Sequence, residues 1–303
     1  MGQRGQVPTP FTRSQVSTTG LRTWDLRGPE VRREHHGVYA EAYLEPDAAT
    51  SIAAARLVLP GDALVDGLTA LQVMGVDLGP DRPLRFVTAH PHQVRRPGLR
   101  VRRVGALPAA DPSGGSVSAA TAFVAAARDL DLVELVAAGD WLVRLRRTSW
   151  TELVEAAAMF RGRHAQLARR AAALVRERVD SPQETRLQLC LVLAGLPEPE
   201  VNPVITVGGR RLGRVDLLLR RWRVVVEYEG DQHRTDTRQW NVDIGRHEQL
   251  NEGEWFLVRI TKDRMEHPRT VVAQVVRALR AGGWEGPEPV FDAEWHRLFP
   301  TAR

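Results

Sequence analysis

Three acidic side chains interrupt apolar runs in the last third of the chain. Asp216 lies inside the run at residues 215–219, and Glu227 and Glu229 directly continue the run at residues 224–226. Burying a carboxylate without a partner costs on the order of several kcal/mol. Acids at these positions therefore need a positive partner, which is either a bound cation or a nearby arginine side chain.

The spacing of the two runs predicts a β-hairpin whose turn lies at residues 220–223. If Leu219 pairs with Val224, Asp216 falls opposite Glu227. Because side chains alternate between the two faces of a strand, Glu229 joins Glu227 on the same face. Opposed like charges repel each other. A divalent cation would offset that repulsion, since Mg²⁺ commonly takes one or two carboxylates and completes its shell with water and phosphate oxygens.

The alternative is a solvated face on which the acids pair with the neighbouring arginines Arg214, Arg220 and Arg223. The apolar density of both runs favours instead a central pair of strands that is buried on both faces. We therefore expect Asp216, Glu227 and Glu229 to form a metal site.

The elements around these acids predict a mixed α/β (α+β) fold. Ser181 is placed to cap a helix, Pro182 takes its first position, Glu184 would close a capping box, and Gly195 marks its end. The order continues with the strand VITVGG, the two hairpin strands, a helix at about residues 239–252, the strand WFLVRIT, and a helix at about residues 268–281. This order places helices over a sheet.

An acid in one strand followed by Glu-x-acid in the next resembles the core of PD-(D/E)XK nucleases. The similarity is closer to a bacterial domain-of-unknown-function family related to very short patch repair (Vsr) endonucleases. That family shows Glu-x-(Asp/Glu)-Gly-x-x-His, a later Asp-x-x-Arg, a Leu, a Gly and a VLRIT-like strand. This chain supplies them as Glu227, Glu229, Gly230, His233, Asp243, Arg246, Leu250, Gly253 and LVRIT. The resemblance covers about residues 181–281 and implies a restriction-endonuclease-like αβββαβ core in a domain at residues 181–303.

The resemblance also implies roles for these side chains. Asp216 and Glu227 would be ligands of Mg²⁺ or Mn²⁺, and Glu229 a further ligand or a base. Glu184 would be the helix-borne acid that many of these nucleases have, although capping its own helix also explains it. His233 could orient a water, act as a general acid or base, or cap a loop.

One residue departs from the nuclease motif, because Glu229 stands where the lysine of Glu-x-Lys would be. In those nucleases the lysine positions the attacking water or stabilises charge on the phosphate. Arg214, Arg246 or a second metal could take over, and Arg246 could instead form an ion pair with Asp243 one helical turn away. Two functions stay open: a metal-dependent endonuclease acting on DNA, and a non-catalytic DNA-binding regulator or antitoxin with a degenerate nuclease core.

Arginine supplies almost all of the positive charge. The net charge is +5, and Lys262 is the only lysine. Arginine suits bidentate phosphate contact, and clusters at residues 95–103, 161–170 and 210–223 favour nucleic-acid binding, although a GC-rich genome would also explain them. We expect four arginines to contact the DNA backbone: Arg214, Arg246, Arg100 and Arg102.

The first half of the chain also carries a resemblance. Its segments RREHHGVYA, PGDALVDGLTALQVMGVDLG, PLRFVTAHPHQVRRPGLRVRRV and LVELVAAGDWLVR are similar to actinobacterial proteins that pair the nuclease-like domain with an AbiEi-type antitoxin region. The resemblance implies a mainly helical N-terminal region, with a short winged-helix-like segment at residues 1–45 and an AbiEi-antitoxin-like mixed helical region at residues 46–180. Two strand-like runs, LRFVTA and LRVRRV, interrupt it. It also implies a role in phage defence or DNA repair and a cognate toxin or defence-system protein as partner.

Cysteine content and hydropathy indicate the compartment. One cysteine, Cys190, excludes an internal disulfide framework and fits a reducing cytoplasm. Its place on an apolar helix face predicts a core thiol. The N-terminus has no apolar signal segment, and no run of about 18 apolar residues occurs. We therefore expect a soluble cytoplasmic protein without a membrane span.

Overall fold

The computed structural model describes residues 10–43, 47–77, 79, 83–207, 210–229 and 254–301. The chain divides into two compact units, Met1–Asp129 and Leu130–Arg303. Both contain helices and small sheets, which confirms the mixed α/β class. No helix within the described ranges has the length and apolar character needed to cross a bilayer.

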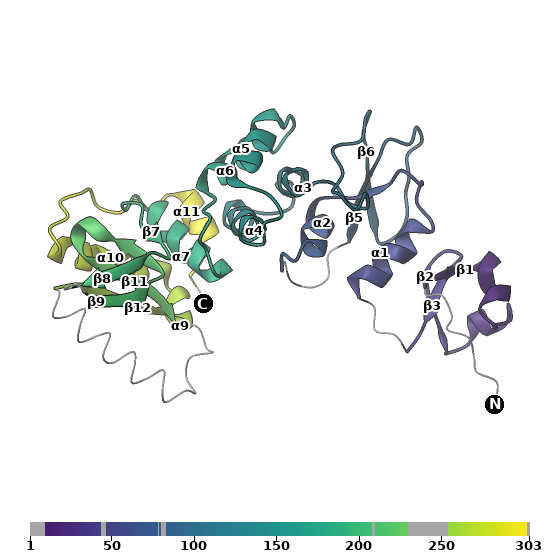
Figure 1. Ribbon diagram of the computed structural model, residues 1–303, viewed down its shortest axis with the longest axis horizontal. Helices are drawn as coiled ribbons and strands as arrows, with labels where there is room; N and C mark the ends of the chain where they lie inside the picture. Colours follow the sequence, from purple (N-terminus) through teal and green to yellow (C-terminus); the bar gives the residue numbers. More distant parts are fainter. Residues whose placement is uncertain are drawn as a thin grey trace. The chain divides into compact units, whose positions relative to one another are not determined.

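The first unit begins with a small antiparallel sheet of order β1-β3-β2 (Figure 1). Its elements are β1 (Phe11–Thr12), the 3-10 helices η1 (Arg13–Thr18) and η2 (Asp25–Arg27), β2 (Val31–His35) and β3 (Val38–Glu41). Between residues 10 and 43 the described chain contains no α-helix that could act as a recognition helix. The hairpin formed by β2 and β3 is the dominant feature of this segment.

The rest of the first unit is a three-stranded sheet covered by helices. In chain order it contains α1 (Ala48–Arg56), β4 (Leu64–Val65), α2 (Gly67–Val73), β5 (Leu84–Thr88), β6 (Leu99–Arg103) and α3 (Ala119–Ala126). β5 is central, antiparallel to β4 and parallel to β6, so both strand-like runs of this region are strands as expected. α2 packs against β5 and α3, which buries Leu68, Leu71, Phe86 and Phe123.

The second unit opens with four helices: α4 (Leu132–Arg144), α5 (Trp150–Met159), α6 (Ala165–Leu174) and α7 (Pro182–Val192). α4 packs against α5, α6 and α7. As predicted, Ser181 caps α7, Pro182 lies in its first turn, and Gly195 follows its end with φ +88°, a left-handed conformation that glycine adopts without a steric penalty.

Cys190 is a core thiol, as predicted. Its side chain is fully buried in α7, and its carbonyl oxygen accepts a hydrogen bond from the Trp295 indole at 3.0 Å. Burial raises the pKa of the thiol to about 12. The residue is therefore protonated and unreactive at neutral pH.

The sheet of the second unit has the strand order β12-β11-β10-β7. These strands are β7 (Glu200–Val201), β10 (Leu217–Leu219), β11 (Val224–Glu229) and β12 (Phe256–Thr261), and β8 (Val204–Val207) and β9 (Arg210–Arg214) form a separate hairpin. α7 packs against β11, and α10 (Pro268–Ala281) packs against β11 and β12 (Figure 1). Three short helices complete the unit: η3 (Arg220–Trp222), α9 (Lys262–Met265) and α11 (Ala293–Leu298). The helix expected at residues 239–252 lies outside the described residues.

The predicted hairpin is confirmed in its register. Leu217, Leu218 and Leu219 pair antiparallel with Val226, Val225 and Val224. The chain turns through η3 and Arg223, which has a φ of +55°. β10 and β11 are the two interior strands, and all six paired residues are buried. Leu218 and Val225 pack with Ile205 and Val215 in one apolar cluster. The two apolar runs of the hairpin are therefore buried, as their composition predicted.

Candidate active site

Glu184 extends from the first turn of α7 and is 8% exposed. Its carboxylate accepts hydrogen bonds from the Ser181 hydroxyl at 3.0 Å, the Asp180 N–H at 2.9 Å and the Asn202 side-chain amide at 2.5 Å. Ser181 in turn accepts the Glu184 N–H at 3.2 Å. Glu184 therefore supports the start of its helix through the N–H of Asp180, one residue before the cap, and not through the Ser181 N–H that the predicted capping box requires.

The charge of Glu184 is coupled to that of Asp216. Burial raises the pKa of the Glu184 carboxyl, the hydrogen bond from Asn202 opposes that rise, and the negative charge of Asp216 adds to it. The Ser181 hydrogen bond and the positive charge of Arg214 lower the same pKa. The fold thus brings the helix acid, the strand acid and Arg214 within electrostatic range of one another.

Asp216 lies directly before β10 and is tied to its neighbours through both backbone and side chain. Its carbonyl oxygen accepts the Asn202 N–H at 2.7 Å. Its carboxylate Oδ2 accepts the Tyr228 N–H, also at 2.7 Å. Tyr228 lies between Glu227 and Glu229, and continuing the hairpin register by one residue places Asp216 opposite Glu227. The two acids thus lie one residue beyond the last paired residues, Leu217 and Val226.

Glu229 has an arginine partner that sequence reasoning did not name. β12 runs parallel to β11, with Arg259 beside Glu227 and Thr261 beside Glu229. The Arg259 Nε lies 3.0 Å from Glu229 Oε1, and both side chains are partly exposed. The Arg259 guanidinium group thus lies next to the two acids of β11. In the sequence, Arg259 was part of the LVRIT strand of the family resemblance, and no role was predicted for it.

The three arginines that the sequence offered as partners for the acids form ion pairs with other carboxylates. These pairs are Arg214 with Asp180, Arg220 with Glu200 at 2.6 Å, and Arg223 with Glu254 at 2.8 Å. Asp180 also pairs with Arg144 at the end of α4. An arginine thus neutralises the charge of Glu229, as the alternative interpretation expected, but that arginine is Arg259 and not one of these three.

Asn202 is a site residue that sequence reasoning missed. It is 5% exposed and has a left-handed φ of +50°, which asparagine tolerates better than most residues. Its side-chain amide donates to the Arg178 carbonyl at 2.8 Å as well as to Glu184. The Asn-Pro dipeptide marks a turn in the sequence, but nothing in the pattern links it to Glu184.

Asp140 is a second buried acid next to α7 that sequence reasoning missed. It is 2% exposed and accepts the Thr185 hydroxyl at 2.6 Å and the Arg176 N–H at 2.7 Å. Burial raises the pKa of Asp140 to about 7, against the lowering effect of those two hydrogen bonds and of the Arg176 charge. Asp140 contacts Thr185, the residue after Glu184. It therefore helps to hold the first turn of α7, which carries Glu184.

The described residues contain no group of three or more His, Cys, Asp and Glu side chains that could hold a metal ion. Glu229, the third expected ligand, lies against Arg259. Asp216 and Glu227, opposed across the hairpin, fit the way Mg²⁺ uses one or two carboxylates together with water and phosphate oxygens.

The remaining expected site residues lie elsewhere. His233, Asp243 and Arg246 are outside the described residues. Arg100 and Arg102 lie on β6 of the first unit, where Arg102 pairs with Asp66 at 2.9 Å and Arg100 is exposed.

Two mycobacterial proteins are similar to this chain over most of its length. They are the uncharacterized protein MT2308 of Mycobacterium tuberculosis strain CDC 1551 / Oshkosh and the uncharacterized protein Rv2248 of strain ATCC 25618 / H37Rv. Each is 30% identical over 280 residues, which cover 88% of this chain and 94% of the relative. The chain belongs to their family. Because neither compact unit is that long, the family shares parts of both units.

No protein-family model matches the chain. No solved structure matches it significantly.

Proposed function

We propose that this protein is a metal-dependent nuclease that hydrolyses phosphodiester bonds in DNA, with its centre in the Leu130–Arg303 unit. The observation that supports this most strongly is the hairpin register, which opposes Asp216 and Glu227 at the end of a buried strand pair. The succession of α7, antiparallel strands, parallel β12 and α10 is compatible with the restriction-endonuclease-like core that the motifs imply.

Asp216 and Glu227 would hold the cation, Mg²⁺ or Mn²⁺. Such a cation, when bound, activates a water and neutralises charge that develops on phosphate. Glu184 acts as a positioning residue in this proposal, because three donors fix its carboxylate. Its negative charge beside Asp216 favours a cation at the neighbouring pair of acids.

Arg259 would supply the positive charge that the missing lysine provides in related nucleases. Its guanidinium group lies beside β11 and is held by Glu229. A guanidinium group carries several donors in a planar fork that matches phosphate oxygens, and fixed donors of this kind stabilise transition-state charge. Glu229 then serves to orient Arg259 and is not a metal ligand.

A DNA-binding regulator or antitoxin without turnover is the second candidate. The Glu229–Arg259 ion pair favours it, because that pair neutralises Glu229 without any metal. In this case a cognate toxin or defence-system protein would be the partner. In both cases we propose a cytoplasmic location, where DNA is accessible.

A cleavage assay on the full chain separates the two candidates. Plasmid, linear, mismatched and single-stranded DNA are incubated with Mg²⁺ or Mn²⁺, for wild type and for Asp216→Ala. The nuclease proposal predicts cleavage that requires metal and is lost in the variant. DNA binding without cleavage of any substrate by wild type, together with cleavage gained by Glu229→Lys, would make the regulator the better account.

A further inference from the structure

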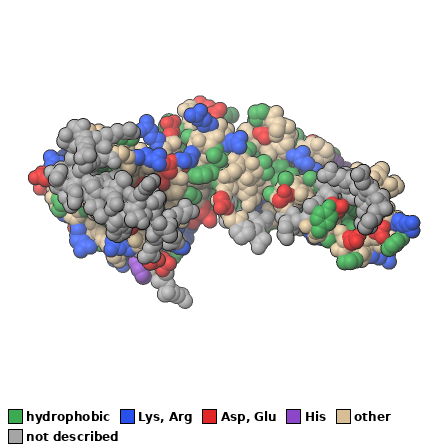
Figure 2. Space-filling view, turned by 60° about the horizontal axis from the view of Figure 1, so that its bottom comes forward, with side chains coloured by type: hydrophobic (Ala, Val, Ile, Leu, Met, Phe, Trp, Pro, Cys, Tyr) green, Lys and Arg blue, Asp and Glu red, His purple; other side chains and the backbone are tan. Residues whose placement is uncertain are grey.

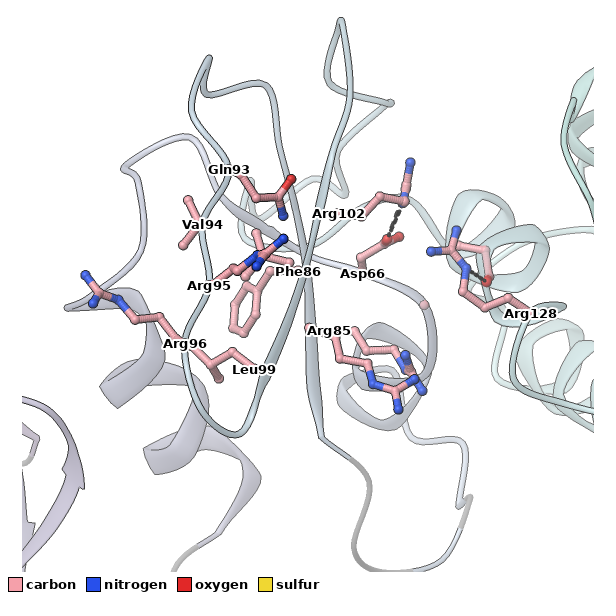
Figure 3. A pocket seen from close by; sticks show the side chains of 14 residues that line it. Asp66, Arg85, Phe86, Gln93, Val94, Arg95, Arg96, Leu99, Arg102 and Arg128 are labelled. Atoms are coloured by element: carbon pink, nitrogen blue, oxygen red, sulfur yellow. Dashed lines mark hydrogen bonds and ion pairs between the residues drawn. The ribbon is translucent and has the colours of Figure 1, made fainter.

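The Met1–Asp129 unit contains a cavity of about 430 Å³ that the proposed nuclease centre does not use. Its walls come from β5, β6, the loop before β6 and the end of α3 (Figure 3). The single acidic residue among the lining residues is Asp66. The basic lining residues are Arg85, Arg95, Arg96, Arg100, Arg102 and Arg128.

Two of these arginines are held in place by carboxylates, one from buried Asp66 and one from partly buried Asp129. Arg85 is 9% exposed, and its Nη2 lies 2.7 Å from Asp129 Oδ1. Arg102 donates from Nε at 3.1 Å and from Nη2 at 2.9 Å to Asp66 Oδ2. Because these guanidinium groups are already ordered, a ligand that binds them loses less affinity to side-chain entropy.

The other arginines leave the cavity positively charged. Arg95 and Arg100 are exposed at its rim, Arg96 extends away from its middle, and Arg128 donates its Nε to the Ala125 carbonyl at 2.9 Å (Figure 3). Asp66 and Asp129 offset two of the six positive charges, so an excess of about four remains. Since a phosphate group carries roughly one and a half to two negative charges at neutral pH, a ligand with two or three phosphates would balance it.

Part of the cavity wall argues for more than phosphate. The apolar side chains of Val94, Leu99 and Val101 line the cavity beside the arginines. They offer no hydrogen bond to phosphate, but they can pack against the base or the sugar that a nucleotide carries.

We propose that this cavity binds the phosphorylated end of a nucleotide, supplied either as a nucleoside triphosphate or as the 5′-phosphate of a nucleic-acid strand. The volume lies in the range of roughly 300–1,000 Å³ that small-ligand pockets have. The site is separate from Asp216 and Glu227, so it does not depend on the proposed nuclease activity.

The burial of Arg85 argues against contact with a DNA duplex that passes over the surface. On the described surface drawn in Figure 2, basic and acidic side chains are intermixed. The arginines of the cavity line one pocket that opens to solvent, and Arg85 is too deeply buried to reach a passing duplex. This geometry suits a phosphate group that enters end-on.

The test is a titration of the full chain in EDTA, which removes any contribution from a metal centre. The probes are ATP, inorganic triphosphate, and single-stranded oligonucleotides with a 5′-phosphate or a 5′-hydroxyl. The variants are Arg95→Gln and Arg100→Gln at the rim. Arg103→Gln is the matched control, because Arg103 lies on the same strand, is exposed, and is not among the residues that line the cavity.

The expected result is saturable binding of ATP or of the 5′-phosphorylated strand, weakened about tenfold or more by each rim variant, since each removes a charge-assisted hydrogen bond. Arg103→Gln should bind as wild type does. Tight ATP binding identifies a nucleoside triphosphate, whereas a preference for the 5′-phosphate over the 5′-hydroxyl strand identifies a strand end. Three results would overturn the proposal: no binding of either probe, equal weakening by Arg103→Gln, or inorganic triphosphate binding as tightly as ATP.

Discussion

Replacing Asp140 by asparagine should change how the stability of the Leu130–Arg303 unit depends on pH. Asp140 is buried on α4, and burial raises the pKa of its carboxyl from 3.8 to about 7. The folded state therefore binds this proton more strongly than the unfolded state does. The stability that protonated Asp140 contributes is complete below about pH 4 and is lost as the pH rises through about 7.

The size of the effect follows from the pKa difference of about three units. Each unit corresponds to about 1.4 kcal/mol, so the loss amounts to about 4 kcal/mol between pH 4 and pH 8. Asparagine resembles the protonated acid, because its oxygen can accept the Arg176 N–H and its amide can donate to the Thr185 hydroxyl. The two proteins should be similarly stable near pH 4, and Asp140→Asn should be the more stable one above pH 7.

The assay is urea unfolding at a series of pH values, followed by tryptophan fluorescence. Seven of the eight tryptophans lie in residues 130–303, so the signal reports on this unit. Burial also raises the pKa of Glu184, and the charge of Glu184 adds to the rise of the Asp140 pKa, so the difference between the two proteins reports on Asp140 together with this coupling. Glu155→Gln, at an exposed position of α5, controls for the change in net charge. Parallel stability curves for wild type and Asp140→Asn would refute the reasoning.

Three further predictions concern the candidate site. Millimolar Mg²⁺ should raise the melting temperature of wild type, by an amount that corresponds to about 2.7 kcal/mol at 100 times the dissociation constant, and should leave Asp216→Ala unchanged in calorimetry; no shift in wild type would count against the metal pair. Asn202→Ala should lower the free energy of unfolding by about 2–3 kcal/mol, because it removes a donor to buried Glu184 and puts alanine in a left-handed conformation that asparagine tolerates better. An unchanged urea unfolding curve would show that the Asn202–Glu184 hydrogen bond contributes little. Arg259→Gln should slow DNA cleavage about tenfold or more, whereas Arg264→Gln, on the neighbouring α9, should cleave like wild type; equal rates for all three would remove Arg259 from the mechanism.

Local patterns carried the parts of the fold that could be predicted from the sequence. The start of α7 followed from Ser181 and Pro182, and the hairpin register followed from two apolar runs joined by a short turn. Each depends on residues that are close together in the chain. Extending that register by one residue places Asp216 opposite Glu227.

Contacts between distant residues could not be predicted in the same way. Arg259 reaches Glu229 because β12 is parallel to β11, and a parallel pair needs a long connection whose ends no local pattern aligns. Asn202 meets Glu184, and Asp140 meets Thr185, only through packing of separate elements.

The arginine cavity depends both on a local sequence pattern and on contacts between distant residues. The cluster at residues 95–103 is evident in the sequence. Its carboxylate partners are not, because Asp66 and Asp129 come from segments that reach β6 and β5 only in the folded chain. A run of arginines therefore predicted a basic surface, and the structure adds that part of this surface is an open pocket.

Cleavage by Glu227→Gln tests the central claim most directly. Wild type, Glu227→Gln and the control Glu155→Gln are compared on the best DNA substrate with Mg²⁺, and DNA binding is measured in parallel. Because the amide keeps the size of the side chain and removes the charge that holds the cation, we predict a cleavage rate at least about 100-fold lower for Glu227→Gln, with DNA binding within about twofold of wild type and full activity in Glu155→Gln. Cleavage that survives Glu227→Gln undiminished would contradict the account.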